Sequence, residues 1–457
     1  MICDTPRFMI AAPSSGSGKT TVTCALLSAM KNMGKKPASF KCGPDYIDPM
    51  FHTKVLGVPS SNLDLFLTGE EICRYILCKN ADGADIAVIE GVMGYYDGLG
   101  TDGLYSSYHL ARFTGTPAIL VADCKGVSLT LAATVKGAAD FRDDSNIKGV
   151  ILNNANEKSF PMYREMIERE TGVPVLGYLP ALPDCRFESR RLGLVTPAET
   201  SDIASRLQKL AETAAKTIDI DRIFQIAGGI SGLSCEKPAI EKKFSVKIAV
   251  AMDNAFCFYY HDALELLCAL GAEIAYFSPL KDKKMPDCDG FIIGGGYPEL
   301  YIEELSANKN MLRDIKTKAG AGLPHMAECG GFLYLMDEIT GLCGNTGAMA
   351  GVISGKAFIT KKLARFGYAA LTAKTDNILC REGETIHAHE FHYSDTTNNG
   401  CSFSAKKPTG GTAWDCVIAD ERRFAGFSHI HLLGNIRCAE NFLKVCQREK
   451  DMKCAKC

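Results

Sequence analysis

The chain has 457 residues, of which 46% are hydrophobic and 23% are charged, and its formal net charge is −2. This composition is typical of globular proteins, and the length is sufficient for two or three domains. The chain has no excess of basic residues, so we expect no nucleic-acid partner. It has no run of 18 or more apolar residues, so we expect no membrane partner. The apolar stretch at the N-terminus is too short for a signal peptide, so we expect a cytoplasmic protein.

Short apolar segments and helix-length segments alternate through the first half of the chain. This alternation is typical of a parallel sheet covered by helices on both faces. We therefore expect an α/β fold. The predicted strands are residues 7–12, 37–41, 85–91, 117–123, 147–155 and 174–180.

The segment APSSGSGKTT, residues 12–21, follows the first predicted strand and precedes a helical pattern. Gly-rich turns let successive backbone N–H groups face an anion, and the helix N-terminus adds its dipole. Lys19 can reach the outer phosphates, and the Thr20 hydroxyl can bind Mg²⁺. A Gly-rich turn without a ligand is the alternative, but strand, loop and helix stand in the order that a phosphate loop requires. The residues predicted to contact ATP are Ser17, Gly18, Lys19, Thr20, Thr21 and Lys41.

Four acidic residues lie where strands of this domain are predicted to end. Glu90 directly follows an apolar strand, and Asp45, Asp48 and Asp97 lie in Gly-rich loops. Ligands collect at the carboxyl ends of parallel strands. Each aspartate taken singly is also a common turn residue. Considering the four together, we predict Thr20, Asp45 and Glu90 as Mg²⁺ ligands, and Asp48 and Asp97 as substrate contacts.

A second series of strands and helices begins after a stretch that is first Gly/Ser-rich and then charged. Residues 231–244 of this stretch are predicted to be a linker. The linker separates a first domain, 1–230, from a second domain, 245–457. The second domain opens with the apolar segment VKIAVAMD, residues 246–253. The prediction is therefore two tandem α/β domains.

Cys329 lies between an apolar segment and a helical pattern, in AECGGFLYL. A nucleophile on a sharp strand-to-helix turn is exposed, and the small residues Ala327, Gly330 and Gly331 permit its strained backbone. A helix N-terminus also favours a thiolate. Most of the 20 cysteines are expected to be reduced and to pack as small hydrophobic residues, and this context sets Cys329 apart as a predicted nucleophile.

Two histidines near the C-terminus are candidate bases for this cysteine. His431 is the first candidate and His429 competes with it, because residues two apart share one face of a strand. In IIGGGYPEL, glycines follow another predicted strand. We predict that the backbone N–H groups of Gly295 and Gly296 form an oxyanion hole, with a plain tight turn as the alternative.

The segment HAHEFHYS, residues 387–394, contains four potential metal ligands. On a strand, the first two histidines face one side, and Glu390 and His392 face the other. No single face presents three ligands. We therefore expect a polar strand that lines a substrate cleft, with a metal site as the alternative.

The pair Cys454 and Cys457 forms the one C-x-x-C motif of the chain. It lies at a Lys-rich end without a second pair nearby. A frayed tail explains this pair better than a metal site does.

Seven motifs, taken as a set, resemble the cobyrinate a,c-diamide synthases of cobalamin biosynthesis over nearly the whole chain. The resemblance implies a dethiobiotin-synthetase-like phosphate-loop domain followed by a domain similar to class I glutamine amidotransferases. The motifs are, in chain order, GSGKTT (16–21), KCGPDYIDP (41–49), IEGVMGYYDG (89–98), RRLGLVTPAE (190–199), GGGYPEL (294–300), AECGGFLYL (327–335) and HEFHYS (389–394).

The resemblance also implies roles for individual residues. In this group the phosphate loop is one residue longer than usual, so its leading glycine corresponds to Ala12, and Pro13 is no obstacle. Cys329 is implied as the nucleophile and His431 as its partner, aligned with the first histidine of the family segment S-Y-x-H-L-H. Many class I amidotransferases orient this histidine with a glutamate two positions later. Leu433 stands there, so a third member is not identified.

Three residues are implied near the acyl-acceptor site, namely Arg190, Arg191 and Glu199. A guanidinium group pairs with a carboxylate through two hydrogen bonds, which suits a polycarboxylate substrate. Solvated surface arginines are the alternative.

The implied reaction is ATP-dependent amidation of the a and c carboxylates of cobyrinate through an acyl phosphate, with ammonia from glutamine. The expected partners are cobyrinate or a related tetrapyrrole, glutamine and ATP with Mg²⁺, and a homodimer is one option for the assembly. The same chemistry on nickel-sirohydrochlorin or hydrogenobyrinate is an alternative. A ParA-like ATPase with an inactive amidotransferase domain is an alternative of another class.

Overall fold

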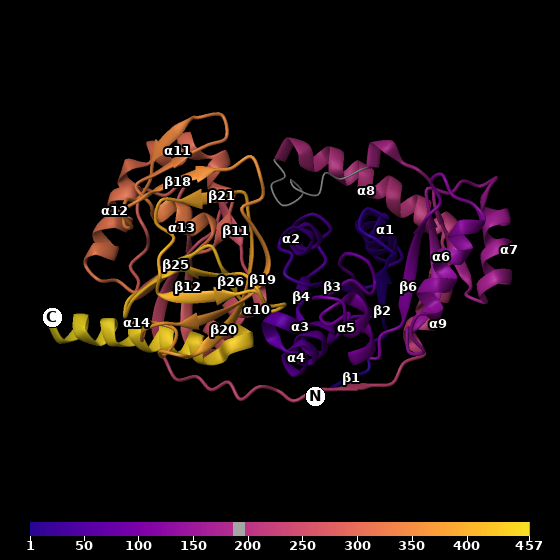
Figure 1. Cartoon of the computed structure of the whole chain (residues 1–457), viewed down its shortest axis with the longest axis horizontal. Helices are drawn as coiled ribbons and strands as arrows, with labels where there is room; N and C mark the ends of the chain where they lie inside the picture. Colours follow the sequence, from indigo (N-terminus) through magenta and orange to yellow (C-terminus); the bar gives the residue numbers. More distant parts are fainter. Residues whose placement is uncertain (186–196, 457) are drawn as a thin grey trace. The chain divides into compact units, whose positions relative to one another are not determined.

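The computed structural model describes residues 1–185 and 197–456, and the chain divides into two compact units (Figure 1). The first unit comprises Met1–Leu65 and Gly69–Pro238. The second comprises Phe66–Thr68 and the chain from Ala239 onward. Each unit has its own sheets and its own apolar core, so each is described separately.

The first unit contains a parallel sheet, in which the described residues form seven strands in the order β4-β3-β5-β2-β6-β7-β8. The edge strand β4 is absent from the sequence prediction, because its residues SSNL are polar and resemble a turn. A two-stranded ribbon of β1 and β9 lies outside this sheet. The bounds are β1 (Ile2–Cys3), β2 (Arg7–Ala11), β3 (Pro37–Cys42), β4 (Ser60–Leu63), β5 (Ile86–Glu90), β6 (Ala118–Asp123), β7 (Ile147–Asn153), β8 (Val175–Leu179) and β9 (Leu233–Ser234).

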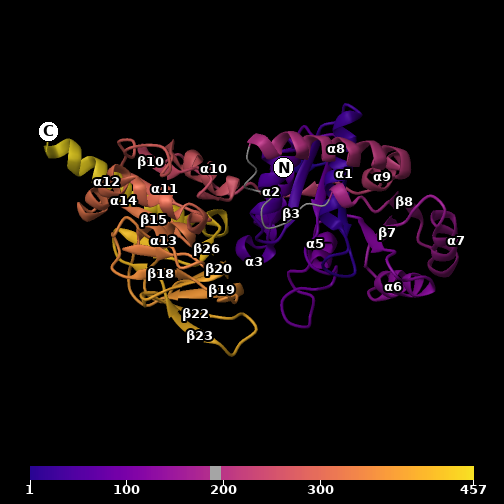
Figure 2. The same cartoon turned by 90° about the horizontal axis from the view of Figure 1, so that it is seen from above.

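Helices α1, α8 and α9 bury one face of this sheet. Alternate strand residues such as Phe8 and Ile10 pack with Leu26 of α1 and Leu210 of α8 in one core. Each fully buried aliphatic side chain contributes roughly 1.5–3 kcal/mol. Figure 2 shows α1 and α8 side by side. The helices are α1 (Lys19–Asn32), α2 (Ile47–Lys54), α4 (Glu70–Ala81), α5 (Ser107–Phe113), α6 (Leu129–Asp140), α7 (Phe160–Thr171), η1 (Pro183–Cys185), α8 (Pro197–Thr217) and α9 (Ile220–Gly228).

The second unit contains a six-stranded sheet in the order β12-β10-β13-β15-β25-β24 among its described residues, parallel except for β24. It also contains an antiparallel sheet, β23-β22-β19-β20-β26, which the sequence analysis did not predict as a whole. The bounds are β10 (Val246–Ala251), β11 (Phe256–Phe258), β12 (Ala272–Phe277), β13 (Gly290–Ile293), β14 (Gly295–Gly296), β15 (His325–Glu328), β16 (Glu338–Thr340), β17 (Thr346–Ala348), β18 (Lys356–Ile359), β19 (Arg365–Ala373), β20 (Thr385–His392), β21 (Ser394–Thr396), β22 (Phe403–Lys406), β23 (Ala413–Cys416), β24 (Ile418–Ala419), β25 (Arg423–Gly426) and β26 (His429–Ile430).

The helices of the second unit lie mainly around its six-stranded sheet. Phe291 and Ile293 of β13 pack with Phe332 and Leu333 of α13 in the core of this unit. Within residues 1–185 and 197–456, no helix combines the length and apolar character needed to cross a membrane. The helical segments are α3 (Leu65–Thr68), α10 (His261–Leu270), η2 (Pro298–Leu300), α11 (Ile302–Ala307), α12 (Lys309–Gly320), α13 (Gly330–Leu335), η3 (Leu432–Asn435) and α14 (Ile436–Lys456).

Candidate nucleotide and glutaminase sites

The loop between β2 and α1 has the backbone shape of a phosphate cradle. Gly16 and Gly18 have φ values of +81° and +98°, which favour glycine, and Gly18 is the residue that precedes α1. A Cβ atom on Gly18 would lie 2.2 Å from Nδ2 of Asn153. That amide donates a hydrogen bond to the backbone oxygen of Ser17 at 2.9 Å. Asn153 therefore supports the loop from β7, a role that the sequence analysis did not identify.

Lys19 starts α1, and its ammonium group lies over this loop. It donates hydrogen bonds to the backbone oxygens of Ser14 and Met93. Burial lowers the pKa of Lys19 to about 8, and the nearby charge of Lys41 acts in the same direction. A desolvated ammonium group at a helix N-terminus can interact strongly with phosphate oxygens.

Glu90, Lys41 and Thr20 meet at the carboxyl ends of adjacent strands, because β3 and β5 pair with Lys41 beside Glu90. Oε1 of Glu90 accepts hydrogen bonds from the Thr20 hydroxyl at 2.6 Å and from Lys41 Nζ at 2.8 Å. Lys41 Nζ also lies 2.6 Å from Oδ2 of Asp48. Burial raises the pKa of Glu90 to about 7, although the charge of Lys41 opposes this shift.

The residues predicted to bind Mg²⁺ provide suitable oxygen ligands. The second oxygen of Glu90, Oε2, is buried and has no hydrogen-bond partner among the described residues. One oxygen of Asp45 accepts the backbone N–H groups of Ile47 and Asp48 and so caps α2. No group of three or more His, Cys, Asp or Glu residues in the described chain could hold a metal ion. Magnesium here would therefore require the Thr20 hydroxyl and phosphate oxygens as additional ligands.

Asp97 shapes the loop that follows β5. Its Oδ2 accepts the N–H of Gly94 at 2.9 Å, and the N–H of Tyr95 donates to the backbone oxygen of Ala12. This loop therefore packs against the start of the phosphate loop. The predicted substrate contacts Arg190 and Arg191 lie outside the described residues, as does the side chain of Glu199.

Cys329 lies on a strained turn between β15 and α13, in the second unit. Its φ and ψ angles are +46° and −103°, an unusual conformation for a residue other than glycine. A Cβ atom on Gly331 would lie 2.1 Å from the backbone oxygen of Ile293, and one on Gly330 would lie 3.0 Å from the nitrogen of Gly296. The two glycines after the cysteine are therefore required by the close approach of this neighbouring backbone. Such a turn is typical of a catalytic nucleophile. The expectation that Cys329 is exposed is wrong for this structure, because the residue is buried, with an exposure of 8%.

The structure brings His429, rather than the predicted His431, to the thiol. The imidazole of His429 is hydrogen-bonded to the side chain of Cys329, and its Nδ1 lies 3.3 Å from Oε2 of Glu328. Burial favours the neutral ring, but the contacts with Cys329 and Glu328 outweigh it and raise the pKa of His429 to about 10. The contact with Cys329 that was expected of His431 is therefore made by His429, and the role of His429 in catalysis is taken up below as a proposal.

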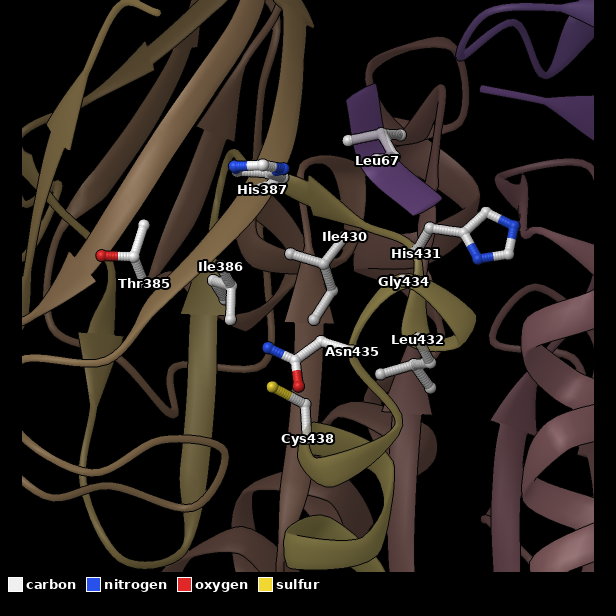
Figure 3. Close-up of a pocket in the computed structure, with 10 residues that line it drawn as sticks. All are labelled: Leu67, Thr385, Ile386, His387, Ile430, His431, Leu432, Gly434, Asn435 and Cys438. Atoms are coloured by element: carbon white, nitrogen blue, oxygen red, sulfur yellow. The ribbon is translucent and has the colours of Figure 1, made fainter. Parts of the chain in front are cut away.

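His431 occupies a different, enclosed environment. Its ring stacks on Tyr260 with a centroid distance of 4.5 Å, and its nitrogens have no hydrogen-bond partner among the described residues. Burial lowers the pKa of His431 to about 4. Its side chain borders a cavity of about 150 Å³, all within the second unit (Figure 3). The lining residues are Leu67, Thr385, Ile386, His387, Ile430, His431, Leu432, Gly434, Asn435 and Cys438.

The sequence contained a signal that could have identified His429. The family segment ends in H-L-H, and the chain has H-I-H at residues 429–431. When His429 and His431 are aligned with the two histidines of H-L-H, both positions match, and Leu433 no longer stands in place of the second histidine. The sequence analysis did not identify Glu328. It expected the orienting glutamate two positions after His431, whereas Glu328 directly precedes Cys329.

The predicted oxyanion residues lie on β14, close to the start of α13. The N–H of Gly331 donates to the backbone oxygen of Gly294 at 3.0 Å, and the N–H of Gly294 donates to the Tyr259 hydroxyl at 2.7 Å. These bonds hold the backbone of Gly295 and Gly296 beside the residues that follow Cys329. Their function as oxyanion donors remains a prediction.

Comparisons with known proteins assign each half of the chain to a domain family. The CobQ/CobB/MinD/ParA nucleotide-binding domain matches residues 8–193, and the CobB/CobQ-like glutamine amidotransferase domain matches residues 247–436. The predicted fold class, a phosphate-loop domain followed by a glutamine amidotransferase domain, is confirmed. The solved structure of the MinD cell division protein of Aquifex aeolicus is similar over 51% of this chain and 100% of that chain, with 15% sequence identity and a TM-score of 0.31. This identity and this TM-score are too low to support a conclusion.

Full-length relatives narrow this assignment. The cobyrinate a,c-diamide synthase of Caldanaerobacter subterraneus subsp. tengcongensis is 38% identical, over 96% of this chain and 98% of the relative. Those of Clostridium tetani and Clostridium acetobutylicum are 40% and 41% identical, each over 95% of this chain and over 99% and 98% of the relatives. The two domains define an enzyme of the glutamine-hydrolysing carbon–nitrogen ligase class. Within that class, the chain belongs to the cobyrinate a,c-diamide synthase family.

Proposed function

We propose that this protein converts the a and c side-chain carboxylates of cobyrinate into amides, using ATP and ammonia from glutamine. The observation that carries the proposal is the Cys329–His429–Glu328 arrangement in a chain that also has the phosphate loop GSGKTT. The names of relatives at 38–41% identity support cobyrinate as the substrate.

In the first domain, the carboxylate of the substrate needs activation, because hydroxide is a poor leaving group. Lys19 and the backbone N–H groups of the loop would bind the phosphates of ATP and neutralise charge as the γ-phosphoryl group passes to the carboxylate. Thr20, Glu90 and Asp45 would hold Mg²⁺, which would supply further charge neutralisation when bound. The product of this step is an acyl phosphate, which ammonia can attack.

In the second domain, Cys329 would attack the side-chain amide of glutamine. His429, whose raised pKa keeps the imidazole protonated, holds the proton that pairs with the thiolate and gives it to the departing nitrogen, while Glu328 holds the ring in the required orientation. The N–H group of Gly296 is suited to stabilise the oxyanion. Ammonia leaves, a glutamyl thioester remains, and water releases glutamate.

Three further assignments belong to this proposal. The functional domains are residues 1–230 and 245–457, joined by the linker 231–244. The location is the cytoplasm, which is supported by the finding that every described cysteine is a free thiol. A homodimer is one option for the assembly.

The proposal is tested by incubating the purified protein with ATP, Mg²⁺, glutamine and a panel of tetrapyrroles, and measuring the products by mass spectrometry. The panel contains cobyrinate, hydrogenobyrinate and nickel-sirohydrochlorin. We expect two successive amidations of cobyrinate. If only hydrogenobyrinate or nickel-sirohydrochlorin is amidated, the proposed amidation chemistry stands and cobyrinate is rejected as the substrate. No amidation of any of them, in a preparation that does hydrolyse glutamine, would reject the proposed synthesis.

A further inference from the structure

The strand β20 carries most of the HEFHYS motif, to which the reaction above assigns no role. β20 pairs antiparallel with β26, with Ala388 opposite Ile430 and His389 opposite His429. The same register places Glu390 opposite Ser428. Because side chains alternate across a strand, Glu390 and Ser428 share the face opposite to that of His429.

Glu390 is joined directly to the residue that precedes His429. Its Oε1 accepts a hydrogen bond from the Ser428 hydroxyl at 2.7 Å, and both side chains are buried, with exposures of 2% and 0%. Its Oε2 lies 3.7 Å from Arg365 Nε and 3.8 Å from His392 Nε2. Burial raises the pKa of Glu390, but the proximity of His392, the hydrogen bond from Ser428 and the charge of Arg365 outweigh it, so the net pKa is lowered.

Phe427, one residue earlier, is fixed by two aromatic contacts. The His392 ring stacks on it at 3.9 Å with an interplanar angle of 7°, and His392 Nδ1 donates to the backbone oxygen of Ser394 at 2.7 Å. Phe427 also makes an edge contact at 5.3 Å with Phe332 of α13, the helix that follows Cys329. The two residues before His429 are thus held both by β20 and by the helix of the nucleophile.

We propose that Glu390 is a positioning residue of the glutaminase, which, together with His392, fixes the chain before His429 so that its imidazole faces Cys329. This proposal rests on the proposed role of the Cys329–His429 pair. A charge-assisted hydrogen bond is stronger and more directional than a neutral one, which explains a buried carboxylate here. Catalytic groups need placement to within about 0.5 Å, and a shift of the Ser428 backbone moves His429 with it. On this proposal, Glu390 and His392 of the HEFHYS segment serve the glutaminase.

The test uses Ser428→Ala and Glu390→Gln in the full-length protein. Ser402→Ala is the matched control, because the Ser402 hydroxyl also bridges two segments of this unit through Ala419. We expect both test variants to lower kcat for glutamine hydrolysis by about 100-fold with little change in KM, and the control to stay close to wild type.

A second measurement needs no turnover. The rate at which iodoacetamide alkylates Cys329 is followed against pH, by mass spectrometry of the peptide that contains it, without glutamine. We expect Ser428→Ala and Glu390→Gln to shift this pH–rate profile in the same direction as His429→Asn. Unfolded protein would instead react as a free thiol with a pKa of about 8.5, so the folded fraction of each variant is measured by circular dichroism beforehand.

The outcomes separate this proposal from the proposed function. Folded test variants with wild-type kcat and a wild-type alkylation profile would reject the positioning role while leaving the Cys329–His429 pair intact. A wild-type profile in His429→Asn would reject the pair itself. If both test variants fail to fold while the Ser402→Ala control folds, Glu390 has a folding role and the positioning role is rejected.

Discussion

Nδ1 of His429 lies 3.3 Å from Oε2 of Glu328, and Glu328 is the residue that directly precedes Cys329. The proposed nucleophile and the carboxylate that contacts its proposed base therefore come from the end of one strand, β15. The proposed base, His429, comes from β26, which belongs to another sheet. A carboxylate on Nδ1 fixes the tautomer of the imidazole and directs the other nitrogen toward the thiol.

Glu328→Gln is expected to lower kcat for glutamine hydrolysis by about 100- to 10,000-fold, because an amide does not stabilise the protonated imidazole of His429 as a carboxylate does. Glutaminase assays with purified protein measure this effect. Glu338→Gln is the control, because the Glu338 carboxylate pairs with Lys356 at a distance of 3.0 Å and makes no contact in the Cys329 site. A Glu328→Gln variant with wild-type kcat would remove Glu328 from the catalytic group.

The two neighbouring histidines are expected to respond very differently to substitution. His429→Asn removes the base and should lower glutaminase kcat by roughly 100- to 10,000-fold. His431→Asn should lower it by less than about tenfold, since the His431 ring stacks on Tyr260 and does not contact the thiol. Steady-state kinetics of both variants decide between them. If His431→Asn lowers kcat as much as His429→Asn, or more, His431 is the better candidate for the base.

Cys329→Ala is expected to abolish amide synthesis from glutamine and to retain synthesis from ammonium salts, because the thiol is needed only to release ammonia. The assay measures amidated product with each nitrogen source near pH 8. Cys343→Ala, at an exposed cysteine of the same unit, is the control. Lys19→Ala should abolish synthesis from both sources. Loss of both activities in Cys329→Ala would contradict a division of labour between the two domains.

Acid is expected to destabilise the protein through His431. Burial lowers the pKa of His431 to about 4, whereas an unfolded histidine has a pKa near 6.5. Between these values the unfolded state binds more protons, so the free energy of unfolding should fall as pH falls, by up to about 1.4 kcal/mol per pH unit from this group. The loss should level off below pH 4.

Denaturant unfolding of wild type and His431→Phe from pH 7 to pH 4 measures this contribution. Phenylalanine preserves an aromatic ring beside Tyr260 and does not titrate, so the variant should show a shallower slope. His261→Gln, at a surface histidine, is the control and should retain the wild-type slope. Identical slopes in His431→Phe and wild type would show that the buried ring does not contribute.

The sequence by itself determined the features whose chemistry is local. The phosphate loop needs glycines, a lysine and a threonine at fixed spacing between a strand and a helix, and a nucleophile turn needs small residues directly beside the cysteine. Both patterns are complete within about ten residues. The alternation of strands and helices likewise follows from neighbouring residues.

Only the tertiary structure decided which histidine contacts the thiol, which carboxylate contacts that histidine, and which strand pairs with β26. His429 and His431 are two positions apart and equally polar, so local pattern could not rank them. Their difference arises from contacts with β15 and with Tyr260, which lie more than a hundred residues away along the chain. Asn153 and the edge strand β4 escaped prediction for the same reason, since the partners that define them become neighbours only when the sheet forms.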